Sequence, residues 1–143
     1  MKRFVLDNSI AMRWLLASDK SADQKYAELV LKSLIEANAL VPNLWHLEAA
    51  NVLLGAEISG DIDTGEIEGF ISQLENLPIQ LDLLTAHQAF SRTFALARAF
   101  KLSSYEAAYL ELAIREGVPM ATLDKKLLKS AKKAGVEIYL KNN

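Results

Sequence analysis

Residues 3–9, Arg3-Phe4-Val5-Leu6-Asp7-Asn8-Ser9, decide the fold, because an apolar run stops abruptly at residues that favour turns and helix caps. The run predicts a first β-strand over residues 3–6, with a helix directly after Asp7. Four more strands are expected, over residues 39–41, 79–82, 119–123 and 136–140. Because longer stretches of helical period separate these short runs, the chain is predicted to be an α/β protein built on a parallel sheet.

The stretches of helical period predict the remaining secondary structure. Helices are expected over residues 21–37, 43–59, 63 or 64 to 75, 85–100, 103–115 and 124–134. Ser21 is the expected cap of the first of these helices. Its inner face is predicted to carry Ala27, Leu31, Leu34 and Ile35. The next helix is predicted to point inward with Leu44, Leu47, Asn51, Leu54 and Ile58.

The composition indicates a single globular domain over residues 1–143. A chain of 143 residues can bury about two thirds of its unfolded surface, which is enough for one core. With 51% hydrophobic and 24% charged residues, it belongs with globular rather than disordered chains. Since cysteine is absent, disulfides and thiolate zinc sites are excluded. We expect a cytoplasmic protein without a signal peptide or a membrane span.

Two aspartates stand where the chain leaves a predicted strand. Asp7 follows the first strand and Asp124 follows the strand over 119–123, so both are expected at the carboxyl edge of a parallel sheet, where ligands bind. Ser9 and Thr122 each lie two residues from one of them and can orient it by hydrogen bonding. The alternative is structural, because aspartate is also a favoured helix N-cap.

Two glutamates extend this acidic set. Glu48 lies beside the predicted inward stripe of its helix, where a carboxylate needs a partner or a metal unless it reaches water from the edge of the stripe. Glu106 ends the sequence Ser103-Ser104-Tyr105-Glu106, which fits a capping box. A carboxylate on the first turn of that helix also points to the carboxyl edge of the sheet. Capping and metal binding are therefore compatible for Glu106.

Four blocks of the chain, in this order and spacing, resemble those of PIN domains of the VapC toxin type. The blocks are Phe4-Val5-Leu6-Asp7-Asn8-Ser9, Trp45-His46-Leu47-Glu48-Ala49-Ala50-Asn51, Leu102-Ser103-Ser104-Tyr105-Glu106-Ala107-Ala108-Tyr109-Leu110 and Ala121-Thr122-Leu123-Asp124. The resemblance covers almost the whole chain. It implies a three-layer α/β/α fold with a short, mostly parallel central sheet.

The resemblance also implies which residues form the active site. The implied acidic site consists of Asp7, Glu48, Glu106 and Asp124. The implied supporting polar groups are Ser9, Asn51 and Thr122. One departure concerns Glu106, because the family most often has aspartate there, and the longer side chain is expected to alter the geometry around a metal.

Carboxylates that converge in one cleft repel each other, and two unit charges ~5 Å apart cost about 3 kcal/mol at an effective dielectric near 20. Oxygen ligands without cysteine favour Mg²⁺, or Mn²⁺, as the cation that relieves this repulsion. Such an ion suits phosphodiester hydrolysis, and the resemblance implies that the chain is an endoribonuclease that cleaves RNA. The resemblance implies that it is the toxin of a type II toxin–antitoxin system, with a VapB-like antitoxin as partner and a homodimer as its assembly.

The net charge of -2 provides no overall attraction to RNA, so a local basic patch is needed. The candidates for contacts with the RNA backbone are Arg13, Lys125, Lys126, Lys129, Lys132 and Lys133. These lysines also fit a plain solvated face near a helix C-terminus.

Two other functions fit the same residues. One is a phosphohydrolase with Asp7 as nucleophile, although Ser9 stands where haloacid-dehalogenase-like enzymes have a second aspartate. The other is a PIN-like scaffold without strong catalysis, which binds a protein partner.

Overall fold

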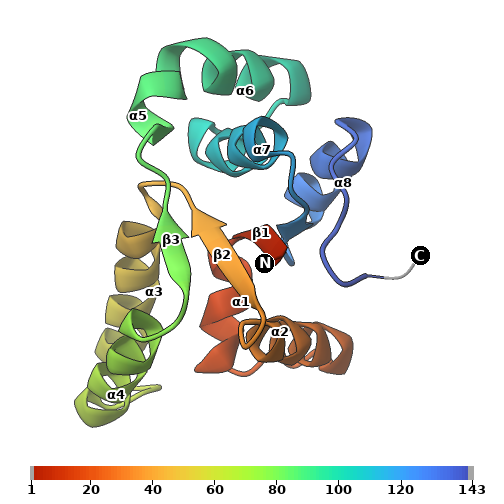
Figure 1. Cartoon of the computed structure of the whole chain (residues 1–143). Coiled ribbons are helices and arrows are strands. Elements are labelled where there is room, and N and C mark those ends of the chain that lie inside the picture. Colours follow the sequence, from red (N-terminus) through yellow and green to blue (C-terminus); the bar gives the residue numbers. More distant parts are fainter. Residues whose placement is uncertain (1, 142–143) are drawn as a thin grey trace.

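The computed structural model describes residues 2–141 and has a parallel four-stranded sheet at its centre (Figure 1). The strands are β1 Lys2–Leu6, β2 Ala37–Val41, β3 Ile79–Leu81 and β4 Met120–Ala121. They lie in the order β3-β2-β1-β4, and each neighbouring pair is parallel. The predicted parallel sheet is therefore confirmed.

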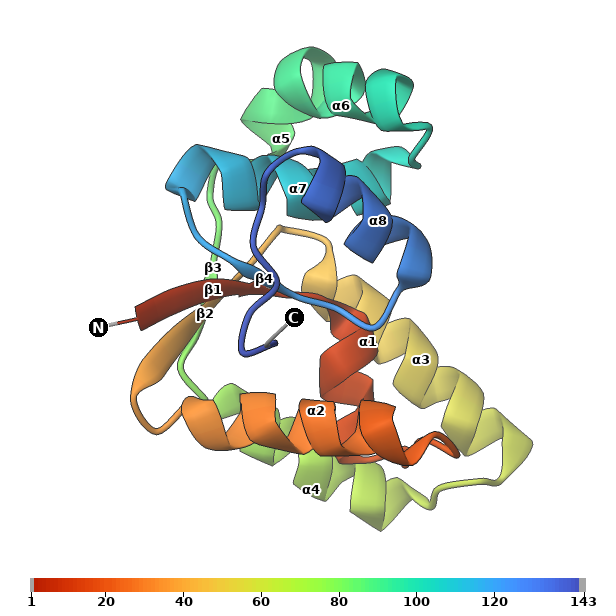
Figure 2. The same ribbon diagram turned by 90° about the vertical axis from the view of Figure 1, so that its right-hand side faces the viewer.

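Helices cover both faces of this sheet, so the fold has three layers (Figure 2). One layer contains α1 Asn8–Ala11, α2 Ser21–Ser33, α3 Trp45–Ser59 and α4 Thr64–Glu75. The other contains α5 Thr85–Gln88, α6 Phe94–Phe100, α7 Ser104–Glu116 and α8 Lys125–Lys133. The predicted α/β/α arrangement is confirmed. Within residues 2–141, none of the helices is both long and apolar enough to cross a membrane.

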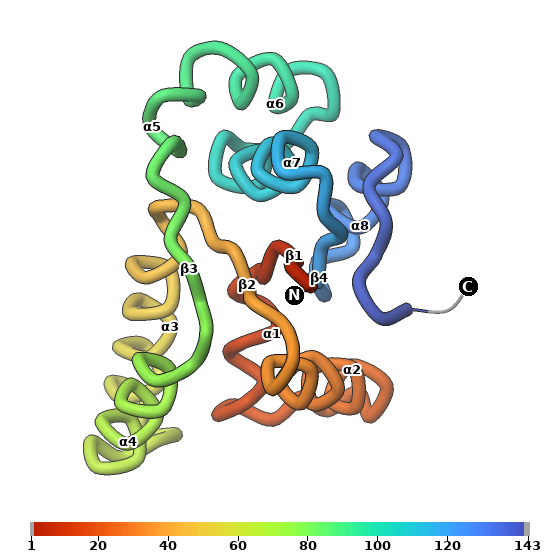
Figure 3. Tube along the Cα trace, in the orientation of Figure 1, coloured from red at the N-terminus to blue at the C-terminus, as the bar shows by residue number. Residues whose placement is uncertain are grey.

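β1 is an inner strand of the sheet and lies between the two helical layers (Figure 3). Phe4, Val5 and Leu6 are fully buried, because helices cover both faces of the strand. The ring of Phe4 stacks on that of Tyr139, with 3.9 Å between the ring centroids. The continuous apolar run that predicted this strand thus reflects burial on both sides, and the polar residues after Leu6 emerge at the carboxyl edge.

The first long helix ends earlier than predicted. α2 stops at Ser33, and β2 begins at Ala37, which pairs with Lys2 of β1. Pairing of Ala37 with β1 therefore ends the helix before residue 37, where the helical pattern had predicted its end. Two details of the prediction are also wrong: Ile35 is 86% exposed in the turn, and Ser21 is the first residue of the helix rather than its cap.

α3 presents the face opposite to the one predicted. Its buried residues are Trp45, Ala49, Leu53 and Ala56. The predicted inward residues Leu47, Leu54 and Ile58 are instead 77%, 53% and 77% exposed, and Asn51 is also exposed. The helix is apolar on both sides, so its periodicity did not determine which side packs; the large ring of Trp45 and the small Ala49 and Ala56 pack against the core.

Two further segments differ from the prediction. Residues 85–100 form one helical path, but a π-helical segment η2, Ala89–Thr93, separates α5 from α6. The predicted strand over 136–140 is reduced to a single parallel bridge between Met120 and Ile138. Extension of that strand stops at Leu140, whose φ of 57° is incompatible with β geometry.

Candidate active site

The four acidic side chains predicted from the sequence line one cavity. Its volume is about 240 Å³, and it is lined by Asp7, Asn8, Ser9, Glu48, Glu106, Tyr109, Asp124 and Leu127. The sheet brings the segments together, because β1 pairs directly with β4 and the backbone N–H of Asp7 donates to the carbonyl of Ala121 at 3.0 Å. α3 supplies Glu48, and the first two turns of α7 supply Glu106 and Tyr109.

Asp7 does not cap α1, although it stands at the N-cap position of that helix. Its side chain accepts no hydrogen bond from the helix backbone. Its Oδ2 instead accepts hydrogen bonds from Ser9 Oγ and Thr122 Oγ1, both at 2.6 Å. The side chain of Asp7 therefore does not cap α1, and Ser9 orients it as predicted. Thr122, which was predicted to orient Asp124, donates to Asp7 instead.

Backbone N–H groups fix the direction in which these two hydroxyls donate. Ser9 Oγ accepts from Leu123 N at 3.0 Å, and Thr122 Oγ1 accepts from Asp124 N at 3.0 Å. Since an amide N–H can only donate, each hydroxyl acts as acceptor there and has its proton free for Asp7. The backbone after β4 thus orients two hydroxyl groups so that both donate to the same oxygen, Asp7 Oδ2.

The environment disfavours the charged form of Asp7. The residue is only 9% exposed, and this burial raises its pKa above the usual value for aspartate. The negative charge of Asp124 raises the pKa further, whereas the hydrogen bonds from Ser9 and Thr122 oppose the rise. Asp7 is thus a nearly buried carboxylate that has hydrogen-bond donors but lacks a neighbouring cation in the described residues.

Glu48 has a similar environment at the edge of α3. Partial burial raises its pKa, a hydrogen bond from the Tyr109 hydroxyl opposes the rise, and the charge of Asp7 adds to it. The Tyr109 hydroxyl donates to Glu48 Oε1 at 2.5 Å. Burial and the neighbouring carboxylates raise the pKa of Tyr109 itself, so the phenol remains a proton donor.

Asp124 and Glu106 serve as helix caps and also line the cavity. Asp124 Oδ1 accepts from Leu127 N at 2.9 Å and caps α8. Glu106 forms the predicted capping box with Ser103. The ammonium group of Lys126 lies 3.8 Å from Glu106 Oε1. For these two residues, the structural role and a place at the cavity coexist.

Three solved structures share this fold at low sequence identity. PAE2754 from Pyrobaculum aerophilum matches with a TM-score of 0.61 at 17% identity, over 90% of this chain and 84% of that chain. A toxin–antitoxin complex from Klebsiella pneumoniae matches with a TM-score of 0.61 at 15% identity, over 86% of this chain and 88% of that chain. FitAcB from Neisseria gonorrhoeae matches with a TM-score of 0.59 at 14% identity, over 95% of this chain and 96% of that chain. The fold is that of a PIN domain. No family model and no curated protein matches the sequence.

Other predicted residues of the chain lie away from the cavity. Asn51 is exposed on α3 and is not among the lining residues, because the packed face of α3 is the opposite one. Arg13 does not line the cavity either. The lysines of α8 are all exposed, and one of them, Lys126, forms an ion pair with an acidic residue of the cavity.

Sequence reasoning did not assign Tyr109 and Asn8 to the site. Tyr109 lies three residues after Glu106, so both residues share one face of α7, and this spacing was a usable signal. Asn8 is buried, and its Nδ2 donates to the carbonyl of Trp45 at 3.4 Å, which ties the start of α1 to α3. A contact between such distant segments leaves no mark in the sequence.

The donor set of the cavity fits a hard divalent cation. Its carboxylates supply oxygen ligands, and burial and mutual repulsion leave Asp7 and Glu48 with charges that a cation would stabilise. Within residues 2–141, however, no three aspartate, glutamate or histidine side chains are already grouped as a cation site. A bound ion would therefore have to draw the carboxylates together or share them with water.

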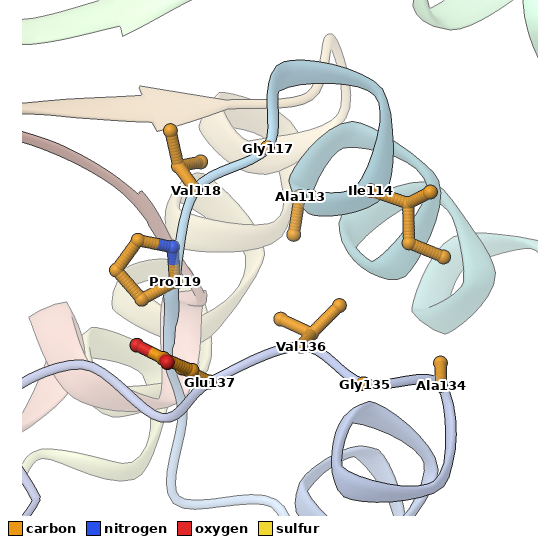
Figure 4. A pocket seen from close by; sticks show the side chains of 9 residues that line it. All are labelled: Ala113, Ile114, Gly117, Val118, Pro119, Ala134, Gly135, Val136 and Glu137. Atoms are coloured by element: carbon orange, nitrogen blue, oxygen red, sulfur yellow. The ribbon is translucent and has the colours of Figure 1, made fainter.

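A larger cavity of about 420 Å³ lies elsewhere in the molecule (Figure 4). It is bounded by the end of α7, the segment before β4 and residues 134–137. Small and apolar residues line it, and Glu137 is its one ionisable lining residue. Hydrolytic chemistry needs more than one such group, so the smaller acidic cavity is the better candidate for the active site.

Proposed function

We propose that this chain is a Mg²⁺-dependent endoribonuclease that cleaves RNA phosphodiester bonds. The observation that carries the proposal is the set of four carboxylates, contributed by four separate segments, around one cavity at the carboxyl edge of the sheet. Asp7 and Glu48 differ from ordinary surface acids in two ways: side-chain hydroxyl groups donate hydrogen bonds to them, and burial raises their pKa values. Perturbed carboxylates that converge in a cleft mark candidate catalytic sites.

In this proposal, the carboxylates of Asp7, Glu48, Glu106 and Asp124 would hold the ion. When bound, Mg²⁺ supplies positive charge that polarises a phosphate group and acidifies water. Ser9 and Thr122 fix the carboxylate plane of Asp7, and Tyr109 fixes that of Glu48. Lys126 lies close enough to Glu106 to position an RNA phosphate at the rim, with Lys125 and Lys129 as further backbone contacts.

The proposal includes the biological role of a toxin in a type II toxin–antitoxin pair. It is supported by the fold shared with a toxin–antitoxin complex and with FitAcB. The partner would be a VapB-like antitoxin. A homodimer is also proposed, and two highly exposed apolar side chains support it: Phe90 in η2 is 96% exposed, and Leu83, two residues after the edge strand β3, is 85% exposed.

One observation favours the catalytically weak scaffold as a second candidate. Glu106 is already engaged in a capping box and an ion pair, and the acids do not stand grouped as a cation site within residues 2–141. Such a protein would use the same surfaces to bind a partner but would not cleave RNA. The phosphohydrolase alternative requires a covalent phosphate on Asp7, whose Oδ2 is occupied by two hydrogen bonds.

Cleavage of labelled single-stranded RNA by the purified chain tests the proposal. Cleavage should require Mg²⁺ or Mn²⁺, stop in EDTA and disappear in Asp7→Asn. Asp19→Asn, which changes an exposed aspartate outside the cavity, is the matched control and should cleave normally. Intact RNA with either metal would favour the scaffold. A phosphate group trapped on Asp7 after reaction with a phosphate ester would favour the phosphohydrolase.

A further inference from the structure

A smaller cavity lies beside the acidic one, on the neighbouring side of the first two turns of α7. Its volume is about 200 Å³, and we call it the side cavity. α7 contributes Tyr105 and Ala108 to the side cavity, whereas it contributes Glu106 and Tyr109 to the acidic cavity. Successive residues of a helix are roughly 100° apart around its axis. The two cavities therefore share one helical wall.

The side cavity is mainly apolar. α5 and η2, which lie beside α7 in Figure 2, form much of its lining. Among the described residues that line it, none carries a charge, and its apolar members are Leu44, Ala86, Ala89 and Ala108. A phosphate or a metal ion would find no opposite charge there. Sites for drug-sized ligands have volumes of roughly 300–1,000 Å³, so the side cavity is suited to one small, uncharged ring system.

Hydrogen bonds hold the walls of the side cavity in place. Thr85 Oγ1, at the start of α5, accepts from the backbone N–H of Asn43 at 2.9 Å and donates to Asp82 Oδ2 at 3.0 Å. The same Oδ2 accepts from Arg115 Nη2 of α7 at 2.7 Å. These contacts join α5, the segment before α3 and α7. The side cavity is therefore formed before a ligand binds, which lowers the cost of binding.

One buried hydroxyl at the side cavity lacks a partner. Thr93 is only 4% exposed, and its hydroxyl forms no hydrogen bond within residues 2–141. The buried hydroxyl of Thr122, by contrast, both donates and accepts. Buried polar side chains are normally hydrogen-bonded, so an unpaired one that lines a cavity indicates a ligand. Thr93 also lies in the π-helical segment η2, and such segments are frequent at functional sites.

The rim of the side cavity adds an aromatic ring and an amide. Tyr105 is 65% exposed, although it lines the side cavity. An exposed aromatic ring can stack on the face of a planar ligand. Asn43 is exposed as well, and its side-chain amide can both donate and accept. Together with the Thr93 hydroxyl, these groups fit the face and the edge of an uncharged heterocycle.

We infer that the side cavity binds one nucleobase, next to the phosphate group that the acidic cavity would hold. The base stacks on Tyr105, and its edge forms hydrogen bonds with the Thr93 hydroxyl and the Asn43 amide. A nucleotide joins a base and a phosphate through one sugar, so two adjacent cavities can hold both. The inference rests on the proposed function for RNA as the source of the base, and it gives the cleavage site a sequence preference.

Titration of the full chain with the four ribonucleosides tests this inference in EDTA, without a metal or a phosphate group. Amide chemical shifts measured by NMR locate the bound nucleoside. The amides of Thr85, Thr93 and Ala108 should shift. The four affinities should differ by at least about fivefold, because the fixed polar groups match one base edge better than the others. Ribose 5-phosphate, which lacks a base, is the control and should leave these amides unchanged.

Thr93→Val removes the unpaired hydroxyl and keeps the shape of the side chain. It should weaken the preferred nucleoside by about fivefold, equivalent to about 1 kcal/mol. Ser91→Ala is the matched control, because it removes an exposed hydroxyl from the same π-helical segment outside the side cavity. Since the Thr93 hydroxyl has no partner in the fold, Thr93→Val should leave the Tm of the ligand-free chain unchanged or raise it.

Ala86→Leu tests the side cavity by filling it. The larger side chain should weaken the preferred nucleoside by at least about tenfold, because it occupies the space of the base. Ala95→Leu on α6 is the matched control, since both alanines are exposed and helical but only Ala86 lines the side cavity. Exposed positions tolerate such changes, so both variants should fold.

Three outcomes would overturn the inference. The first is that none of the nucleosides shifts these amides up to its solubility limit. The second is a clear fall in the Tm of Thr93→Val, which would show that the hydroxyl has a structural partner. The third is a lower sedimentation mass of Ala86→Leu, which would show that a second copy of the chain fills the side cavity.

RNA cleavage separates this inference from the proposed function. In a chain that cleaves RNA, Thr93→Val should change which bases stand beside the cleaved bonds, whereas Ser91→Ala should preserve them. Cleavage without any base preference would refute the base site and retain the nuclease. Nucleoside binding in a chain that never cleaves RNA would refute the nuclease and retain the base site, with a free nucleotide as its ligand.

Discussion

Replacement of Thr122 by valine would remove one of the two hydroxyls that hold Asp7 without changing the size of the side chain. Thr122 is fully buried, donates to Asp7 Oδ2 at 2.6 Å and accepts from Asp124 N at 3.0 Å. A hydrogen bond to a charged group contributes about 1.5–3 kcal/mol, and a buried donor left unpaired costs about 1–3 kcal/mol. Ser9 still donates to the same oxygen, so we expect a loss near the lower end of the sum, about 3 kcal/mol.

This loss should depend on pH. The Thr122 hydroxyl opposes the rise in the pKa of Asp7, so its removal raises that pKa further above the unfolded value. A carboxyl group whose pKa is raised on folding binds its proton more tightly when folded, and its contribution to stability falls as the pH rises through the folded pKa. The deficit of Thr122→Val relative to the unmodified chain should therefore be larger at pH 7 than near pH 4.

Thermal unfolding followed by circular dichroism measures both effects in metal-free buffer. For a chain of this length, about 3 kcal/mol corresponds to a fall in Tm of about 10 °C at pH 7. Thr122→Ser keeps both hydrogen bonds and is the control, with a smaller loss of about 1 kcal/mol from the missing methyl group. Equal Tm values for the valine and serine variants at both pH values would refute the view that the Thr122 hydroxyl stabilises charged Asp7.

Three other substitutions probe the cavity and the core. Asp7→Asn should raise the Tm of the metal-free protein by a few degrees at pH 7, because it removes a buried charge, and should abolish RNA cleavage; a fall in Tm would contradict this. Tyr109→Phe should raise the pKa of Glu48, because it removes the hydroxyl that donates a hydrogen bond to this carboxylate. An NMR titration of the Glu48 carboxyl group measures this pKa, and an unchanged value would contradict the prediction. Arg115→Met should lower the free energy of unfolding in urea by about 3–5 kcal/mol, because the buried carboxylates of Glu111 and Asp82 would both lose their ion-pair partner. A loss below about 1 kcal/mol would show that these ion pairs contribute little to stability.

The sequence predicted the sheet well because each strand leaves a local signal. Burial on both faces makes Phe4, Val5 and Leu6 a continuous apolar run, and the polar residues after them mark the edge of the sheet. Helix ends were predictable where a cap is written in the sequence, as at Asp63, which accepts from Glu66 N, and at Gly117, which has a φ of 64°.

The errors arose where long-range packing chooses between patterns that are equally good locally. Residues 34–37 continue a helical pattern, but pairing of Ala37 with β1 ends the helix first. Ile138 is a residue type that favours strands, but the neighbouring strand β4 has only two residues, so only a single bridge forms between Met120 and Ile138. In both cases the deciding contact lies more than 15 residues away along the chain.

The candidate site was predicted in its four acids and in two supporting groups, Ser9 and Thr122, but not in Tyr109 and Asn8. Asp7 and Asp124 follow from strand ends, and Glu48 and Glu106 from their positions on two helices, whereas the resemblance to PIN domains joined the four acids into one site. Asn51 was assigned to the inward side of α3, so the error in the facing of that helix carried over to it. Glu48 reaches the cavity despite the same error, because it lies at the boundary between the two faces, next to buried Ala49.

The four carboxylates divide into two kinds, and the division bears on how a cation could bind. Asp124 and Glu106 stand at helix N-termini, where backbone N–H groups and the helix dipole stabilise negative charge. Asp7 and Glu48 receive side-chain hydroxyls instead, and burial raises their pKa values. The capping pair thus accepts hydrogen bonds from backbone N–H groups, whereas burial opposes the charged forms of Asp7 and Glu48. A divalent ion beside Asp7 and Glu48 would offset the burial and the mutual repulsion that raise the pKa values of these two carboxyl groups.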